Sequence, residues 1–212
     1  MKNILILITL VSLLLYGCSS NVQSSSAPEN ENQRENDYLS NYSSNPQVTD
    51  DRSLLEVDQE VSDEKGEATL KAINLVNETY PVGPIELRVK DMKVIHLRPD
   101  YSLVDYFHVL THEEEFNFVK VFIEIENMSE EKVNFAPIAM IETSTGEKMD
   151  WEKDIYLEDL NGVIDGNITK KGNIGFIIES SKDLKWIEIT TSDVYDKDEN
   201  ILSDSQKIKI DL

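Results

Sequence analysis

The chain has little cysteine and few of the short motifs that mark common enzymes. Cys18 is the single cysteine in 212 residues, so no disulfide within one copy can stabilise the fold. Glycine-rich phosphate-binding loops and the Gly-x-Ser-x-Gly pattern of serine hydrolases are absent. These absences remove the usual motif-based evidence for nucleotide binding and for serine-nucleophile catalysis.

Positive charge is also scarce. The chain has 20 lysine and arginine residues against 41 aspartate and glutamate residues, a formal net charge of −21. Binding to nucleic acid requires clustered Lys and Arg side chains that contact phosphates, so we exclude nucleic acid as a partner. An acidic chain is not attracted electrostatically to anionic lipid either. Solubility and repulsion from a negative surface explain the charge most simply, and a specific cationic partner is the alternative.

Long hydrophobic runs are missing except at the start of the chain. The apolar run Ile4–Tyr16 follows Lys2 and precedes a polar stretch. It is too short to cross a bilayer core, which takes roughly 20 residues. A basic start followed by a short apolar core is typical of a cleaved secretory signal, so we predict a signal peptide over residues 1–17.

The end of this run carries a recognisable pattern. Leu15, Tyr16, Gly17 and Cys18 resemble the lipobox of bacterial lipoproteins, although Tyr16 is bulkier than the usual residue at its position. The resemblance implies that Cys18 becomes the first residue of the mature chain and carries two or three acyl chains (palmitate). Two chains anchor a protein stably, so we expect a location on the extracytoplasmic face of a cell membrane, in a bacterium of Gram-positive type. An ordinary signal peptide with an incidental cysteine is the alternative.

Residues 18–66 have the composition of a tether. They are rich in Ser, Asn, Glu, Asp and Gln, and apolar residues such as Val48 follow no sustained period. Leu54 and its apolar neighbours suggest at most a short helical turn. Such a segment cannot bury enough apolar surface to offset the entropy of ordering. We therefore predict a disordered linker that holds the next domain away from the membrane.

Residues 67–212 are predicted to form one all-β domain. In Phe118–Glu126, Val119 and the apolar residues at every second position alternate with Lys120 and other polar residues, with Phe122 as an exception. This period of two is typical of half-buried strands. Further strands are expected at residues 70–76, 85–89, 137–143, 174–178, 187–189 and 208–212. Many short strands separated by polar turns favour an antiparallel β-sandwich.

The order of these elements resembles a known kind of domain. The long strand ending at Asn127, a turn with Gly146, the segment Lys171–Phe176 and the strand Trp186–Ile189 are similar to the uncharacterised immunoglobulin-like domains of Gram-positive lipoproteins and secreted antigens. The likeness covers about residues 85–212. It implies an immunoglobulin-like sandwich outside the cytoplasm, and it brings no active-site motif.

Three residues of this pattern have expected structural roles. Asn127 is suited to turn the chain by bonding its own backbone and by tolerating left-handed angles. Gly172 is expected to supply a positive φ at a hairpin, and Gly175 to allow close packing or a bulge within a strand. None of these roles is catalytic.

Two sets of residues are weak candidates for binding a metal ion. His108 and His112 are four residues apart, which on a helix places two imidazoles on one face. Asp196, Asp198 and Asn200 have the alternating spacing of a calcium loop, but the glycine and the final glutamate of that loop are missing. A solvent-exposed connection and a solvated hairpin turn are the simpler interpretations, so we assign no metal and no cofactor.

Aromatic residues cluster in the long connection over residues 98–115. Tyr101, Tyr106 and Phe107 lie there, and Trp151 and Tyr156 follow later in the chain. Aromatic side chains are enriched at contact hot spots, and long loops often carry function. We expect Tyr101, Tyr106 and Phe107 to contribute to a partner-binding surface, with core packing as the alternative.

These observations predict a membrane-anchored lipoprotein that displays a non-catalytic domain at the cell surface. Its partners would be the membrane, through Cys18, and an unidentified protein or ligand of the cell envelope. A cell-envelope hydrolase with an unrecognised carboxylate pair and a weak calcium- or metal-binding module remain the alternatives.

Overall fold

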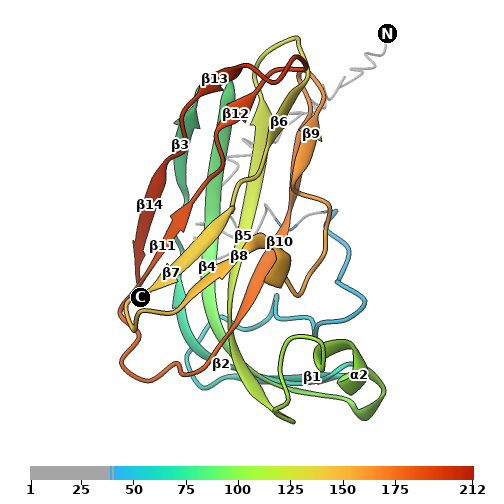
Figure 1. Ribbon diagram of the computed structural model, residues 1–212. Helices are drawn as coiled ribbons and strands as arrows, with labels where there is room; N and C mark the ends of the chain where they lie inside the picture. The colour runs from blue at the N-terminus through green and yellow to red at the C-terminus, as the bar shows by residue number, and fades with distance from the viewer. Residues whose placement is uncertain (1–38, 40) are drawn as a thin grey trace, which may run out of the picture. The chain divides into compact units, whose positions relative to one another are not determined.

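Antiparallel strands are the main regular structure of the computed structural model, which describes Leu39 and residues 41–212 (Figure 1). Over residues 41–212, helical structure is limited to the short turns η2 (Tyr101–Leu103), α2 (Val104–Phe107) and η3 (Trp151–Lys153). The prediction of an all-β antiparallel sandwich is therefore confirmed. The predicted signal peptide and the lipidated Cys18 lie outside the described residues.

The described strands form three sheets. Sheet A has six strands in the order β1-β2-β4-β5-β10, and β3 pairs with the first half of β4. The other two sheets have four strands each, in the orders β14-β11-β7-β8 and β13-β12-β6-β9. The strands of sheet A are β1 (Glu60–Asp63), β2 (Gly66–Asn74), β3 (Glu78–Val82), β4 (Ile85–Pro99), β5 (Phe116–Asn127) and β10 (Thr169–Ile178). The strands of the smaller sheets are β6 (Val133–Phe135), β7 (Met140–Thr143), β8 (Lys148–Asp150), β9 (Gly162–Ile164), β11 (Trp186–Thr190), β12 (Val194–Tyr195), β13 (Ile201–Ser203) and β14 (Lys207–Asp211).

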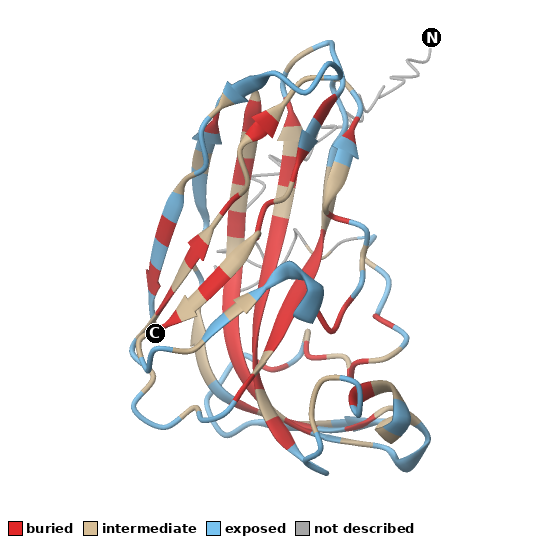
Figure 2. Ribbon diagram, viewed as in Figure 1, coloured by how far each residue is buried: buried red, intermediate tan, exposed pale blue. Residues whose placement is uncertain are grey.

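The main core lies between sheet A and the two smaller sheets. Val119, Val121, Ile123 and Ile125 of β5 all face it and are fully buried, as their alternation predicts. They pack with buried residues from both smaller sheets. Figure 2 shows these buried positions running along β4, β5 and β10. Burial of alternate apolar residues on facing sheets is what makes the fold a sandwich.

A bulge changes the facing of β4 halfway along its length. The pairing with β5 shifts between Val89 and Asp91, and Val89 and Met92 both lie in the main core. A bulge inserts one extra residue and so exchanges the two faces of a strand beyond it. As a result Lys93 and Ile95 are placed on the outer face of sheet A, the face turned away from the smaller sheets.

The outer face of sheet A is also buried over part of its area. Phe118, Lys120 and Phe122 of β5 project to this face and have at most 1% of their surface exposed. The residues 41–58, here called the strap, help to cover it: Val48 and Leu54 pack in a second core with Phe118. The second core comprises Val48, Leu54, Ala68, Leu70, Ile95, Leu97, Phe107, Phe116, Phe118, Ile155 and Tyr156.

This second core corrects the predicted boundary between tether and domain. Residues 41–66 belong to the same compact unit as the sandwich, so the prediction of a disordered linker up to residue 66 and of a domain starting at residue 67 is wrong. Val48 and Leu54 show no period because each fills a place on an apolar surface built by distant strands. The spacing of apolar residues along a segment predicts burial only where that segment forms an apolar face of its own.

The turn predictions are corrected in part. Asn127 ends β5, and its side-chain oxygen accepts a hydrogen bond from the Ser129 backbone N–H at 3.0 Å, as expected for an Asx turn. It is not among the residues with positive φ, and neither is Gly172, which lies inside β10 rather than at a hairpin. Gly175 does allow close packing: a Cβ there would lie 2.7 Å from the Tyr156 ring.

Candidate binding site

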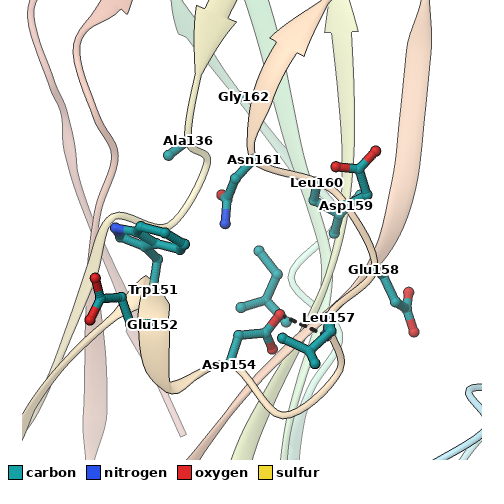
Figure 3. Close-up of a pocket in the computed structure, with 11 residues that line it drawn as sticks. Ala136, Trp151, Glu152, Asp154, Leu157, Glu158, Asp159, Leu160, Asn161 and Gly162 are labelled. Atoms are coloured by element: carbon teal, nitrogen blue, oxygen red, sulfur yellow. Dashed lines mark hydrogen bonds between the residues drawn. The ribbon is translucent and has the colours of Figure 1, made fainter.

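A hollow of about 840 Å³ opens between the segment that follows β8 and the first half of β10 (Figure 3). Its walls come from η3, from the irregular segment 154–161 and from the start of β9. The residues that line it are Ala136, Trp151, Glu152, Asp154, Leu157, Glu158, Asp159, Leu160, Asn161, Gly162 and Ile174.

Two apolar side chains at this hollow are exposed. Trp151 has 51% and Leu157 has 68% of its surface accessible. Leu157 adopts φ of 54°, the left-handed region that is unusual for a residue other than glycine. Such strain costs about 1 to 3 kcal/mol and tends to persist at functional sites. The backbone therefore holds a leucine side chain in solvent at the edge of the hollow.

Asp154 fixes this backbone conformation. Its carboxylate accepts hydrogen bonds from the backbone N–H groups of Tyr156 at 3.0 Å, Leu157 at 3.1 Å and Gly175 at 2.8 Å. Burial raises the pKa of the Asp154 carboxyl, although these three hydrogen bonds act in the opposite direction. The side chain thus clamps the segment 154–158 onto the edge of β10.

Two glycines of β10 allow the segment to lie so close. A Cβ at Gly175 would meet the Tyr156 ring, and a Cβ at Gly172 would meet the carboxylate of Glu158. Both glycines are buried. A side chain at Gly175 would push the wall of the hollow away from the strand, whereas one at Gly172 would displace the Glu158 carboxylate.

The electrostatic character of the hollow is acidic. Glu152 and Asp159 lie at its rim, and none of its lining residues is basic. Figure 3 shows the Asn161 side chain directed into the hollow toward Trp151. The side-chain oxygen of Asn161 is buried and has no hydrogen-bond partner among the described residues. The arrangement offers an aromatic face, an unused acceptor and a negative rim, which together suit a cation with an apolar body.

The aromatic residues predicted to bind a partner are not gathered on one surface. Tyr101 is 91% exposed. The Tyr106 hydroxyl instead donates to the Ile155 carbonyl at 2.6 Å, and Phe107 is buried in the second core. The prediction that Phe107 contributes to a partner-binding surface is therefore wrong. The predicted loop does border a second hollow of about 700 Å³, through Leu110 and other residues that follow α2.

The histidine pair does not share a helical face. Helix α2 ends at Phe107, so His108 is its C-cap and His112 lies beyond it. The two rings are 6.3 Å apart between centroids. The helical spacing that motivated a metal site is therefore absent.

The aspartate loop is a hairpin turn. The Asp196 carboxylate accepts from the backbone N–H groups of Asp198 at 2.8 Å and Asn200 at 2.9 Å, and from the Asn200 side chain at 2.9 Å. These hydrogen bonds lower the pKa of the Asp196 carboxyl. Over residues 41–212, no group of three or more His, Cys, Asp or Glu side chains is arranged to hold a metal ion.

A buried charge cluster lies on the outer face of sheet A. Lys93 of β4 and Lys120 of β5 are register partners, and both donate to the Asp51 carboxylate of the strap, at 2.8 and 2.7 Å. Lys120 also lies 3.4 Å from the Asp91 carboxylate. Burial would raise the pKa of the Asp51 carboxyl, but Lys120 and Lys93 outweigh it and lower this pKa to about 2.

Sequence reasoning treated Lys120 as a solvent-facing residue and did not single out Asp51 or Lys93. The exception in the alternation, Phe122, was the signal available. It shares the outer face with Lys120, and its ring packs edge-on against Tyr42 of the strap, with centroids 5.2 Å apart. An apolar residue on an otherwise polar face indicates that something covers that face.

Comparison with known proteins identifies the family. The chain is 50% identical to the uncharacterized protein YdhF of Bacillus subtilis over 228 aligned residues, which cover 96% of this chain and 97% of YdhF. It is 30% identical over 151 residues to the SPbeta prophage-derived uncharacterized lipoprotein YonS of the same organism, covering 69% of this chain and 67% of YonS. The chain belongs to the family of these proteins, of which one member is named as a lipoprotein. No family model matches the chain.

The fold is shared with a solved structure. A functionally unknown protein from Listeria monocytogenes EGD-e superposes with a TM-score of 0.50 at 12% identity, over 69% of this chain and 88% of that one. At this identity the likeness concerns the fold alone. Within the described part of the chain, no helix is long and apolar enough to cross a membrane.

Proposed function

We propose that the protein is a lipoprotein anchored through Cys18 to the outer face of a bacterial cell membrane, and that its immunoglobulin-like sandwich is a non-catalytic binding domain. The lipobox resemblance at Cys18 supports the anchor. The lipoprotein name of the relative YonS supports the same location.

The ligand of this domain is a positively charged group on an apolar body, and it binds in the hollow beside Trp151. The observation that carries this proposal is the strained, exposed Leu157, which faces the hollow across from an exposed tryptophan. A protein gains nothing in stability from holding a leucine in a left-handed conformation in solvent. Trp151 offers the best aromatic face for a cation, and the acidic rim raises the local concentration of cations.

Two carboxylates of the wall are already engaged in hydrogen bonds to the backbone, which supports binding rather than catalysis. Asp154 is occupied by three backbone N–H groups, and Glu158 accepts from the backbone N–H of Asn173 at 2.8 Å. A catalytic acid or base must be free to exchange a proton with a substrate. Both carboxylates instead fix the backbone of the wall.

Calorimetric titration of the full chain with benzyltrimethylammonium tests the ligand class. We expect saturable heat with a Kd in the millimolar range and no comparable signal from neutral benzyl alcohol. Trp151→Ala should weaken binding by roughly tenfold, the cost of one desolvated cation–aromatic contact. Tyr101→Ala removes an exposed aromatic side chain outside the hollow and should leave binding unchanged. Loss of binding in Tyr101→Ala alone would place the site on the 98–115 segment, as the sequence suggested.

A further inference from the structure

The strap and the hollow share one residue, Glu158. The Glu158 side chain accepts a hydrogen bond from the Tyr42 hydroxyl and another from the Asn45 side-chain amide, the latter at 2.9 Å. Its other carboxylate oxygen accepts from the Asn173 backbone N–H at 2.8 Å. Figure 3 shows Glu158 directed away from the hollow, while its backbone forms part of the wall. The wall is therefore held from behind by the strap.

Asn45 holds the wall on both sides of Leu157. Its side-chain amide donates to the Tyr156 carbonyl at 2.9 Å as well as to the Glu158 carboxylate. Its side-chain oxygen accepts from the backbone N–H groups of Gln47 at 2.9 Å and Val48 at 3.3 Å, which turns the strap at this point. One buried amide thus joins the fold of the strap to the two residues that flank the strained leucine.

The strap is itself fixed to sheet A by contacts of its own. Asp51 bonds to Lys93 and Lys120, and Val48 and Leu54 pack in the second core. A rigid element attached at one end to the sheet and at the other to the wall transmits position between them. The wall segment has no strand partner beyond the contact of Ile155 N–H with the Gly175 carbonyl at 2.9 Å, so its conformation depends on side-chain contacts such as these.

We propose that Tyr42 and Asn45 are positioning residues for the hollow, so that docking of the strap and occupation of the hollow are coupled. The ligand part of this inference rests on the proposed function. Coupling is reciprocal: a strap that holds Leu157 in place strengthens binding, and a bound ligand strengthens docking of the strap by the same factor. The strap lies between Cys18 and the first strand of the sandwich in the sequence, so the coupling would link the occupied hollow to the anchored end of the protein.

Hydrogen exchange of the full chain, read by mass spectrometry, tests the positioning role without any ligand. Asn45→Asp keeps the acceptor oxygen that turns the strap but cannot donate to Glu158 or to the Tyr156 carbonyl. We expect amides of residues 155–160 to exchange roughly fivefold faster or more, the lower end of typical coupling, while amides of β5 are unchanged. Ser44→Ala, at an exposed strap position between the two proposed residues, is the matched control and should match the parent chain.

Unchanged exchange over residues 155–160 in Asn45→Asp would overturn the proposal, and so would an equal acceleration over β5, since Asn45 would then only stabilise the domain. If Asn45→Asp does not fold, Tyr42→Phe decides by the same criteria, because it removes a single hydroxyl.

A second measurement adds benzyltrimethylammonium to the parent chain. Slower exchange of the strap amides is the expected reciprocal effect. If the parent chain binds the probe and the strap is unaffected, the coupling is wrong. If the parent chain does not bind the probe, the proposed ligand class fails, and the positioning role is still decided by the exchange of the variants.

Discussion

Lys93 and Lys120 lie directly opposite each other on neighbouring strands, an arrangement that is destabilising when nothing separates the charges. Their exposed fractions are only 2% and 1%. Asp51 makes the arrangement tolerable because its carboxylate lies between the two ammonium groups and bonds to both. Removing one partner of a buried ion cluster leaves uncompensated charge, which typically costs about 3 to 5 kcal/mol.

The Asp51 contribution should depend on pH in a defined window. The pKa of this carboxyl is about 2 in the folded chain, against an ordinary value of 3.8. A lowered pKa means that the stabilisation is present above about pH 4 and is lost as the pH falls toward 2. The loss amounts to about 2 kcal/mol. We expect Asp51→Asn to be about 3 to 5 kcal/mol less stable than the parent at pH 7, and this difference to shrink by about 2 kcal/mol between pH 4 and pH 2.

Urea unfolding of both chains across this pH range measures the difference. Asp58→Asn, at an exposed strap position, is the control and should stay within about 0.5 kcal/mol of the parent. A difference between parent and Asp51→Asn that does not vary with pH would show that Asp51 is not ionised against the two lysines.

At the scale of elements, the outer edge of β10 is closed by a segment that is not a strand. Asp154 and Glu158 accept hydrogen bonds from the backbone N–H groups of Gly175 and Asn173. Side-chain acceptors thus satisfy an edge that would otherwise offer unpaired donors to another chain. This solution leaves room for a hollow beside the edge, which a further strand would have filled.

The approach of this segment depends on Gly175. We expect Gly175→Ala to lower the free energy of unfolding by about 1 to 3 kcal/mol, the usual cost of overpacking a buried site, because the new Cβ would meet the Tyr156 ring. Thr169→Ala, an exposed position on the same strand, is the control and should cost only a few tenths of a kcal/mol. Denaturant unfolding measures both. Equal stability of Gly175→Ala and the parent would mean that the ring is free to move and that the wall is not rigidly packed.

At the scale of the whole molecule, the domain includes the strap as well as the strands. It supplies Val48 and Leu54 to the second core and, in Asp51, a carboxylate that bonds to both buried lysines. The sandwich core on the other face of sheet A is independent of it. The two faces of one sheet are therefore covered in different ways, one by other sheets and one in part by the strap.

Truncation distinguishes strap from tether. The reference is a chain that begins at residue 41, which keeps the whole strap. A chain that begins at residue 59 should lose at least about 4 kcal/mol, because it lacks two buried apolar side chains and Asp51. Equal stability of the chain that begins at residue 59 would contradict the structural role of the strap.

The sequence by itself determined which residues of each strand share a face. The period of two placed Val119 and its partners in a core and predicted an antiparallel sandwich, because alternation is a local property of extended chain. The same reasoning gave a sound basis for Asn127 as a turn residue and Gly175 as a point of close packing. It also identified Trp151 among the candidate contact aromatics.

Only the tertiary structure decided whether the second face of sheet A meets solvent. Lys120 has the same local pattern whether it is exposed or lies beneath Asp51, which is 69 residues away in the chain. Leu157 likewise carries no sequence signal of its exposure, since its conformation is imposed by Asp154 and by a strap from the other end of the domain. Whether a polar face is buried depends on which distant segment packs on it. The composition of the strap, taken alone, resembles that of a disordered tether.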